Sequence, residues 1–382
     1  MPAVTDTFTD AVGGLGDAAW DGLAGDKFIS SALWLRLCAL EPGGVSGGLH
    51  VTTPGGGRAA IPVAAVTGAV NPPLRWHELL TARGLPAPRP GGLLVGQRRG
   101  YLAHLLTSAG TPRVEAAAAV LDAVRALRSP LLGDGEPARV AMYLTTPDVQ
   151  VFREAGVRTT PVALATDAWI EVPPGGFDAW LASLSAHRAR RVRSEIRTFE
   201  RAGFVAEHQP LTECWRDVGR LLTRSLRRYG GTHDEGPIIE SFRRQGELAG
   251  ARAEVLLCRR PGEEPVGFCM YFRSGDTAYL RALGFDHDRL ASAAEYFNVA
   301  YYTPARLPGV RRIHAGIETA EAKALRGARL QPLWLLDLSE RSPLTGHDEQ
   351  IREHNRALFH RLRDSSAAVA DALEYELWKP YC

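Results

Sequence analysis

The hydrophobic and polar positions of this chain follow two alternating periods. Apolar residues at helical spacing predict helices over 17–40 (in two parts), 113–127, 148–155, 177–184, 187–202, 211–228 and 238–248. Short runs rich in β-formers, broken by Gly and Pro, predict strands over 49–51, 59–66, 93–96, 140–144, 163–171 and 204–208. This alternation is typical of a mixed α/β protein.

The pattern changes after residue 252. Three β-rich runs, 253–258, 266–273 and 277–283, are separated by Pro-Gly and Ser-Gly-Asp turns, which predicts a meander. Helices are then expected over 291–302, 319–326 and 348–373, with strands over 312–315 and 330–336. Both halves show helices first and a mostly antiparallel sheet after. We therefore predict two related α/β (α+β) domains, residues 1–160 and 161–382, the second with a C-terminal helical extension.

Composition adds three constraints. A chain of 382 residues with 45% hydrophobic and 23% charged residues fits a globular protein of about two domains. Only three of the 45 basic residues are lysines, so Lys323 stands out in the second half. Five cysteines without CxxC or metal-ligand spacing predict a reducing compartment and no metal site. No signal peptide or membrane segment is expected, and we predict a cytoplasmic protein.

The first candidate for chemistry is the basic segment 187–201. Val192, Ile196 and Phe199 recur at helical spacing and predict a buried stripe, which leaves a broad basic face outward. The arginine fork suits phosphate, so this face is a candidate for docking RNA or a phosphorylated acceptor. A solvated surface helix in an arginine-rich chain is the alternative. The residues proposed to bind RNA are Arg188, Arg190, Arg191, Arg193 and Arg197.

The second candidate is the strand end at Arg281–Asp288 and the helix that follows it. Polar groups gather where a strand ends beside a helix start, and Glu295 or Tyr296 is suited to orient or deprotonate an amine. Alternatively, Asp286 caps the following turn and Tyr296 belongs to the core.

The third candidate is the segment His314–Trp334. A strand carries His314 and Gly316 to a turn, and Lys323 and Arg326 share one face of the helix that follows. Such a face suits a phosphate or a developing oxyanion. Spacing alone favours the alternative, an ordinary basic pair on the helix surface.

Two of these segments resemble a known family. The text GlyIleGlu-x-x-GluAlaLys-x-x-ArgGlyAla-x-Leu-x-ProLeuTrp, from Gly316 to Trp334, resembles the end of the GNAT-like domain in FemAB-type and peptidoglycan biosynthesis/recognition-type proteins. The run from Phe177 to Gly203 resembles the opening of that domain. The resemblance covers about residues 165–340. It implies tandem GNAT-like domains and amide-bond formation, with an amino acid transferred from aminoacyl-tRNA or an acyl group from coenzyme A.

The donor is predicted from a glycine turn. GNAT enzymes that use coenzyme A hold its pyrophosphate on a Gln/Arg-x-x-Gly-x-Gly/Ala turn, and none follows Leu283. The near match is Gln97–Leu102, which lacks the final small residue. We therefore expect an aminoacyl-tRNA donor, tRNA as partner, no bound cofactor, and a small amine or a cell-wall precursor as acceptor. An acyl-coenzyme A-dependent N-acyltransferase and a non-catalytic GNAT-fold binding module stay open as alternatives.

The resemblance also suggests roles for individual residues. Lys323 and Arg326 are expected to contact phosphate or the oxyanion, and Glu318 or Tyr296 to relay a proton. The predicted catalytic residues are Glu318, Tyr296 and Lys323. The predicted substrate-binding residues are Asp286, Arg281, Asn298, His314 and Arg326.

Overall fold

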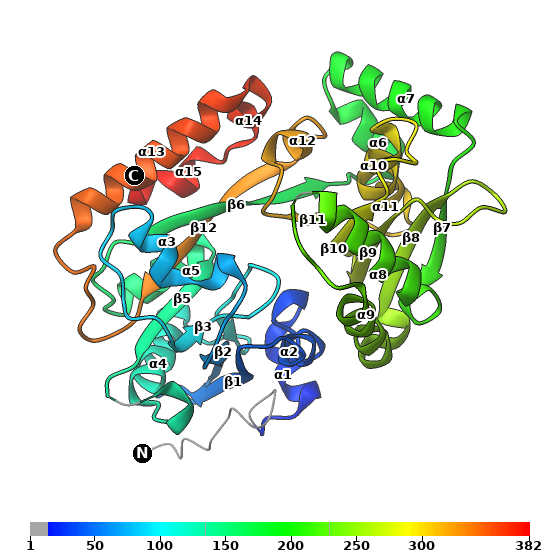
Figure 1. Cartoon of the computed structure of the whole chain (residues 1–382). Coiled ribbons are helices and arrows are strands. Elements are labelled where there is room, and N and C mark those ends of the chain that lie inside the picture. Colours follow the sequence, from blue (N-terminus) through cyan, green and yellow to red (C-terminus); the bar gives the residue numbers. More distant parts are fainter. Residues whose placement is uncertain (1–13, 134, 229) are drawn as a thin grey trace. The chain divides into compact units, whose positions relative to one another are not determined.

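The computed structural model describes residues 14–133, 135–228 and 230–382, and the chain divides into two compact units (Figure 1). The first unit comprises the chain up to Thr166 together with Gln331–Cys382, and the second comprises Asp167–Leu330. Strands β6 (Val162–Glu171) and β12 (Arg329–Asp337) each cross a unit boundary. The division into domains 1–160 and 161–382 stays a prediction. In the division into compact units, the C-terminal segment Gln331–Cys382 belongs to the first unit.

The first unit has the strand order β1-β2-β3-β5-β12, with β4 paired to β2. Neighbours are antiparallel except β3 and β5, which are parallel. The strands of this unit are β1 (Gly44–Thr52), β2 (Arg58–Val66), β3 (Gly92–Val95), β4 (Leu106–Thr107) and β5 (Ala138–Leu144). Its helices are α1 (Asp17–Ala24), α2 (Ala32–Ala39), α3 (Trp76–Thr81), α4 (Arg113–Ala126), α5 (Thr146–Glu154), α13 (Asp348–Ser365), α14 (Ala367–Ala372) and α15 (Tyr375–Trp378).

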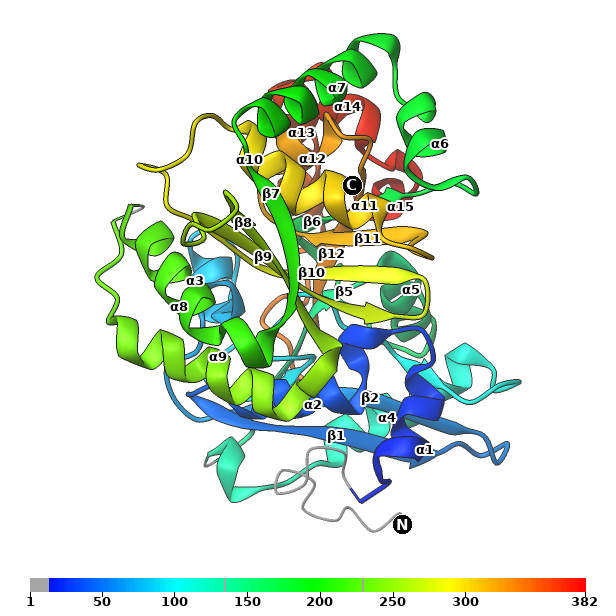
Figure 2. The ribbon, with the colours of Figure 1, turned by 90° about the vertical axis from the view of Figure 1, so that its right-hand side faces the viewer.

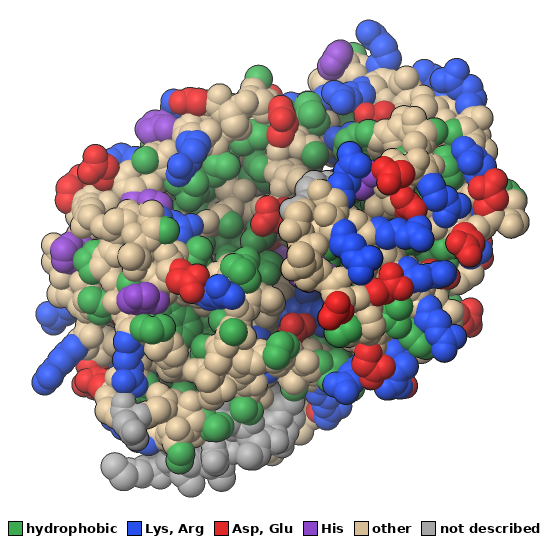
Figure 3. All heavy atoms as spheres, in the orientation of Figure 1, with side chains coloured by type: hydrophobic (Ala, Val, Ile, Leu, Met, Phe, Trp, Pro, Cys, Tyr) green, Lys and Arg blue, Asp and Glu red, His purple; other side chains and the backbone are tan. Residues whose placement is uncertain are grey.

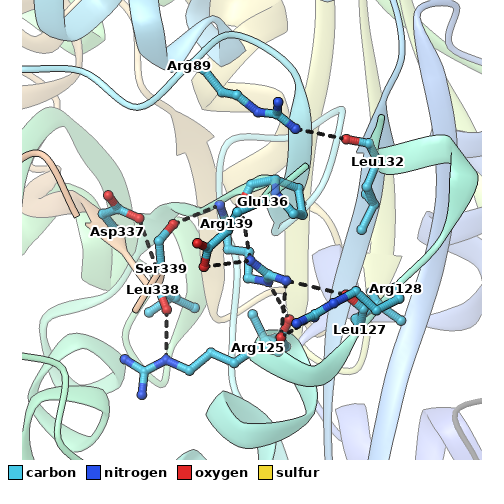
Figure 4. A network of polar contacts seen from close by, with 12 residues as sticks. Arg89, Arg125, Leu127, Arg128, Leu132, Glu136, Arg139, Asp337, Leu338 and Ser339 are labelled. Carbon is cyan, nitrogen blue, oxygen red and sulfur yellow. Dashed lines mark hydrogen bonds and ion pairs between the residues drawn. The ribbon is translucent and has the colours of Figure 1, made fainter. Parts of the chain in front are cut away.

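A buried arginine ties the C-terminal segment to this unit (Figure 4). Arg139 on β5 is 1% exposed and donates to the carbonyls of Val124, Arg125 and Leu127 at the end of α4. Its own carbonyl accepts from the amide of Leu338, just after β12. The guanidinium thus satisfies carbonyls that a helix end leaves unpaired.

The second unit has the strand order β6-β11-β10-β9-β8-β7, antiparallel except for the parallel pair β10 and β11. Its other strands are β7 (Val205–Pro210), β8 (Ala253–Arg259), β9 (Gly267–Ser274), β10 (Thr277–Phe285) and β11 (Arg312–Gly316). Its helices are α6 (Gly176–Ser183), α7 (Ala186–Arg201), α8 (Leu211–Arg228), α9 (Glu235–Ala249), α10 (Ala294–Phe297), α11 (Thr303–Arg306) and α12 (Ala320–Ala324). A π-helical turn, Asn298–Tyr302, joins α10 to α11.

Helices α8 and α9 lie side by side against the strands β8–β10 (Figure 2). Phe242 of α9 packs edge-on against Phe268 of β9, with ring centroids 6.1 Å apart. The contact of α8 with β10 requires Gly284, because a Cβ there would lie 2.6 Å from the Phe268 ring and 2.9 Å from the backbone of Leu222. Glycine at this position therefore sets how closely the helix approaches the sheet.

Each unit contains one parallel strand pair joined through a helix: β3 and β5 through α4, and β10 and β11 through α10 and α11. The described residues form twelve strands in a mixed, mostly antiparallel arrangement with flanking helices, which confirms the predicted α/β class. The sequence pattern missed the short helices α3, α11 and α15 and the two-residue strand β4.

Candidate active site

The parallel strands β10 and β11 part at their carboxyl ends. They pair only from Thr277 with Arg312 to Tyr279 with His314. Beyond that point β10 carries a bulge between Leu280 and Ala282 in its pairing with β9, which leaves Arg281 as the extra residue. A bulge that bends one strand away from its neighbour opens the sheet where α/β proteins commonly place ligands.

A buried polar cluster lies at the last paired position. His314 Nε2 lies 2.8 Å from Asp167 Oδ1, and Trp169 Nε1 donates to Asp167 Oδ2 over 2.7 Å. The His314 and Asp167 side chains are only 4% and 2% exposed. Because Tyr279, His314 and Trp169 are in register, their rings share one face of the sheet, with centroids 4.7 to 6.0 Å apart.

Lys323 lies within the same region of the second unit. It is 4% exposed, and its Nζ donates to the Gly316 carbonyl over 2.8 Å. Burial disfavours the ammonium and lowers the pKa of Lys323 to about 8, while the negative charges of Asp167 and Glu318 partly oppose this shift. The alternative of a surface pair is thus excluded for Lys323, which is a buried amine beside the end of β11.

Tyr296 lies in the helix that follows the opening and packs against Phe285, with ring centroids 5.3 Å apart. Burial raises the pKa of Tyr296, and the nearby hydroxyls of Tyr301 and Thr319 partly counter it. Thr319 precedes α12 with a φ of 56°, which is strained for a β-branched residue. Such strain concentrates at functional sites.

Arg326 is held within the protein. All three of its guanidinium nitrogens donate to protein acceptors: Nε to the Tyr302 hydroxyl, Nη1 to the Ala322 carbonyl and Nη2 to the Glu195 carboxylate. The guanidinium also lies 3.3 Å from the centroid of the Phe297 ring. These contacts join α12 to α7 and to the crossover helix, which is α10 together with the π-helical turn that follows it. They favour a structural role for Arg326 over phosphate binding.

The other predicted substrate contacts are only partly brought together. Asn298 is 1% exposed, and its side-chain nitrogen donates to the carbonyls of Glu195 and Ala294. Asp286 is ion-paired with Arg224 of α8, 2.5 Å away. Arg281 is half-buried in the bulge, and Glu318 is exposed before α12. Asp167 forms a hydrogen bond with His314, and its negative charge also acts on Lys323. Asp286 and Asn298 instead form their polar contacts with Arg224 and with the carbonyls of Glu195 and Ala294.

Helix α7 has the predicted two-sided character. Ser185 caps it by accepting from the Arg188 amide, and its buried residues are Ala189, Val192, Ile196 and Phe199. Figure 3 shows Lys and Arg side chains gathered at the upper right, over this helix. Four of the five proposed arginines are exposed and Arg188 is half-buried: Arg190, Arg191, Arg193 and Arg197 are the exposed ones. Arg191 also pairs with Glu195, 3.0 Å away.

The opening does not fit the pyrophosphate of coenzyme A. The first turn of the crossover helix contains Glu295, a fully buried carboxylate whose Oε2 accepts from the amide and hydroxyl of Ser292. Asp286 and Asp288 precede it. A site that binds an anion on helix amides needs those amides free and no competing negative charge.

The Gln97–Gly100 turn in the first unit does not fit either. Arg98 is 1% exposed and donates to Ser46 Oγ and to the carbonyls of Cys38, Glu41 and Pro42. The chain continues into a bridge at Ala103 and the strand β4, so no helix N-terminus follows the turn.

Sequence reasoning missed Asp167 and undervalued Glu195. Asp167 interrupts the otherwise apolar run of β6, and a carboxylate in a buried strand is the signal that could have identified it. Glu195 lies among arginines, and its local sequence does not distinguish it from a surface carboxylate. Only the folded chain brings it to Arg326 and Tyr302.

Two absences hold for the described residues. None of their helices is long and apolar enough to cross a membrane. Within the same residues, no group of three or more His, Cys, Asp or Glu side chains is placed to hold a metal ion.

No family model and no curated protein matches this sequence. Solved structures do match. The C-terminal domain of a putative lysylphosphatidylglycerol synthetase from Agrobacterium fabrum matches with a TM-score of 0.51 at 11% identity, over 90% of this chain and 97% of that one. A conserved protein of unknown function from Bacteroides thetaiotaomicron matches with 0.52 at 10% identity, over 84% and 91%. FemX matches with 0.50 at 11% identity, over 81% and 96%.

Proposed function

From the FemAB-like tandem GNAT fold that these matches show, we propose that the chain is an amide-forming N-acyltransferase. It takes an aminoacyl group from aminoacyl-tRNA and transfers it to an amine, either a small molecule or a cell-wall precursor. The main support for this donor is the acidic start of the crossover helix. Binding the pyrophosphate of coenzyme A there would require free backbone amides, but the buried carboxylate of Glu295 already binds the Ser292 amide. The structural match to a protein named as a putative lysylphosphatidylglycerol synthetase supports an aminoacyl substrate.

The reaction joins the amine nitrogen to the carbonyl carbon of the aminoacyl ester and releases the ribose oxygen. Negative charge develops on the carbonyl oxygen, and a fixed cation in a dry site stabilises it strongly. Lys323 is suited to this role because its buried ammonium is still mostly protonated at neutral pH, with a pKa of about 8. Glu318 and Tyr296 are the proposed contacts of the acceptor amine, together with Arg281 in the bulge.

The exposed arginines of α7 are proposed to hold the phosphate backbone of the tRNA. Non-specific phosphate contacts supply much of the affinity for nucleic acid and position it without reading sequence. Because charged tRNA is made and used in the cytoplasm, we propose that the reaction takes place there.

The decisive experiment supplies purified protein with total tRNA charged with radiolabelled amino acids and a panel of amines that includes butylamine, hydroxylamine and hydrazine. We expect labelled amides by mass spectrometry, lost after RNase treatment and strongly reduced in Lys323→Met. A parallel reaction contains acetyl-coenzyme A in place of charged tRNA. Transfer that survives RNase and requires acetyl-coenzyme A would show a coenzyme A-dependent enzyme. Amine binding without any transfer would show a binding module.

A further inference from the structure

Amide formation by an amine requires a proton acceptor. The protonated Lys323 and the arginines of α7 are cations and cannot serve as one. Most amines are protonated at neutral pH, and the ammonium has no lone pair with which to attack. Of the predicted proton relays, Tyr296 holds its proton tightly because burial raises its pKa, and Glu318 is exposed to solvent. The buried cluster of Asp167, Trp169 and His314 offers another candidate base.

The contacts of this cluster fix which ring nitrogen of His314 carries the proton. A carboxylate only accepts hydrogen bonds, so the nitrogen that faces Asp167 Oδ1, Nε2, is the protonated one. Nδ1 then carries the lone pair. Nδ1 is buried, and no described residue forms a hydrogen bond with it. Buried polar atoms without a partner are rare and call for an explanation.

Asp167 is itself held in place. Both of its carboxylate oxygens are engaged, Oδ1 by His314 and Oδ2 by the Trp169 indole. It also raises the proton affinity of Lys323 by its charge. A carboxylate fixed in this way orients the imidazole and stabilises the imidazolium that forms when the ring accepts a proton.

His314 also stands at the right place in the fold. It is the last residue of β11 paired with β10, immediately before the two strands part. Gly316, whose carbonyl binds Lys323 Nζ, lies two residues further along β11. The base and the proposed oxyanion contact therefore come from one short segment, residues 314–323, which begins where the two strands part.

We propose that His314 is the general base of the transfer reaction, acting through Nδ1, and that Asp167 is its positioning residue. This inference rests on the proposed function. His314 Nδ1 takes a proton from the acceptor ammonium, the freed nitrogen attacks the ester carbonyl, and the C–N bond forms. The bond from carbonyl carbon to ribose oxygen then breaks, the imidazolium returns its proton to that oxygen, and the nitrogen of the new amide releases its remaining extra proton to water.

The test compares two acceptors that differ in their need for a base. Butylamine is protonated at pH 7.5, whereas hydroxylamine is largely neutral and attacks without losing a proton first. We expect His314→Gln and Asp167→Asn to lower kcat for butylamine about 100-fold or more, with an unchanged KM for charged tRNA. With hydroxylamine, measured above its spontaneous reaction, we expect a loss of about tenfold or less. His354→Gln is the matched control, because it removes a half-buried histidine of α13 in the first unit, outside the cluster, and should leave the rates with both acceptors unchanged.

Equal losses with both acceptors, in variants whose circular dichroism and urea midpoint match the wild type, would overturn the base role. Nitrogen-15 NMR of protein labelled at its 11 histidines checks the tautomer separately, with His314→Gln assigning the signal. We expect a protonated Nε2 in the wild type and a protonated Nδ1 in Asp167→Asn. A protonated Nδ1 in the wild type would refute the dyad whatever the activity. An expected tautomer without transfer to any acceptor would instead refute the proposed function and, with it, the base role.

Discussion

Replacing Lys323 with methionine tests whether its amine is as buried as the structure places it. Folding lowers the pKa of Lys323 from 10.5 to about 8, so the folded chain binds fewer protons than the unfolded chain between these pH values. Stability then rises with pH across this window, and below pH 8 the folded state carries the full cost of the buried charge. At about 1.4 kcal/mol per pKa unit, that cost is about 3 kcal/mol.

Methionine keeps the volume of the side chain and removes the charge, but it leaves the Gly316 carbonyl without its donor, which costs about 1–3 kcal/mol. At pH 7 the two effects oppose each other, and we expect Lys323→Met to be at least as stable as the wild type. At pH 10 the wild type has lost most of its penalty. The variant should therefore lose about 2–3 kcal/mol relative to the wild type between pH 7 and pH 10.

Urea unfolding of both proteins at pH 7 and pH 10 gives the difference in free energy of unfolding between wild type and variant at each pH. The change in this difference reports on Lys323, because the titration of all groups that the two proteins share cancels. Lys379→Met is the matched control, because that side chain is 61% exposed and its replacement removes no buried charge. A wild-type-to-variant difference that does not change with pH would refute the reasoning, since it would mean that the Lys323 ammonium is solvated in the folded protein.

Three further predictions follow from the same geometry. If protonated Lys323 stabilises the oxyanion, the transfer rate of the wild type falls as the pH rises through about 8, and an active Lys323→Arg variant lacks this fall. A wild-type rate that keeps rising above pH 8 would refute the assignment. Arg326→Met leaves the Glu195 carboxylate without its buried partner and should destabilise the protein by about 3–5 kcal/mol in urea unfolding, whereas a loss below about 1 kcal/mol would contradict the structural role. Replacing three exposed arginines of α7 with glutamine should weaken the binding of total tRNA. It should also reduce the slope of log affinity against log salt concentration by about 0.7–0.9 per lost phosphate contact. Equal weakening by three exposed arginines elsewhere would count against a tRNA-binding role of α7. The α7 set is Arg190, Arg193 and Arg197, and the control set of exposed arginines elsewhere is Arg216, Arg244 and Arg341.

Local sequence predicted most of the elements because their signals are local. Apolar spacing in α7 and α8, the Ser185 cap and the turns of the meander depend on residues a few positions apart. Helix α3 was missed because it is six residues long, follows two prolines and buries only Trp76 and Leu80, too few positions for a period to emerge. The Gly316–Trp334 and Phe177–Gly203 motifs carried the fold resemblance that the solved structures support.

The candidate site was only partly predictable for the opposite reason. Lys323 and Arg326 share a helical face, and spacing cannot distinguish a buried amine from a surface pair. Arg326 proved to be bound by Glu195, 131 residues earlier in the chain, and His314 by Asp167, 147 residues earlier.

The sequence by itself therefore determined the α/β class, the element order, the two-sided character of α7 and the lack of a glycine turn after Leu283. Each depends on the chemistry of neighbouring residues, and neighbours in sequence stay neighbours in space. Only the tertiary structure decided that β10 and β11 part after His314, that Lys323 is buried, and that Asp167 fixes the His314 tautomer. Strand pairing, burial and long-range hydrogen bonds depend on which distant segments meet, and those contacts create the electrostatics on which the proposed chemistry depends.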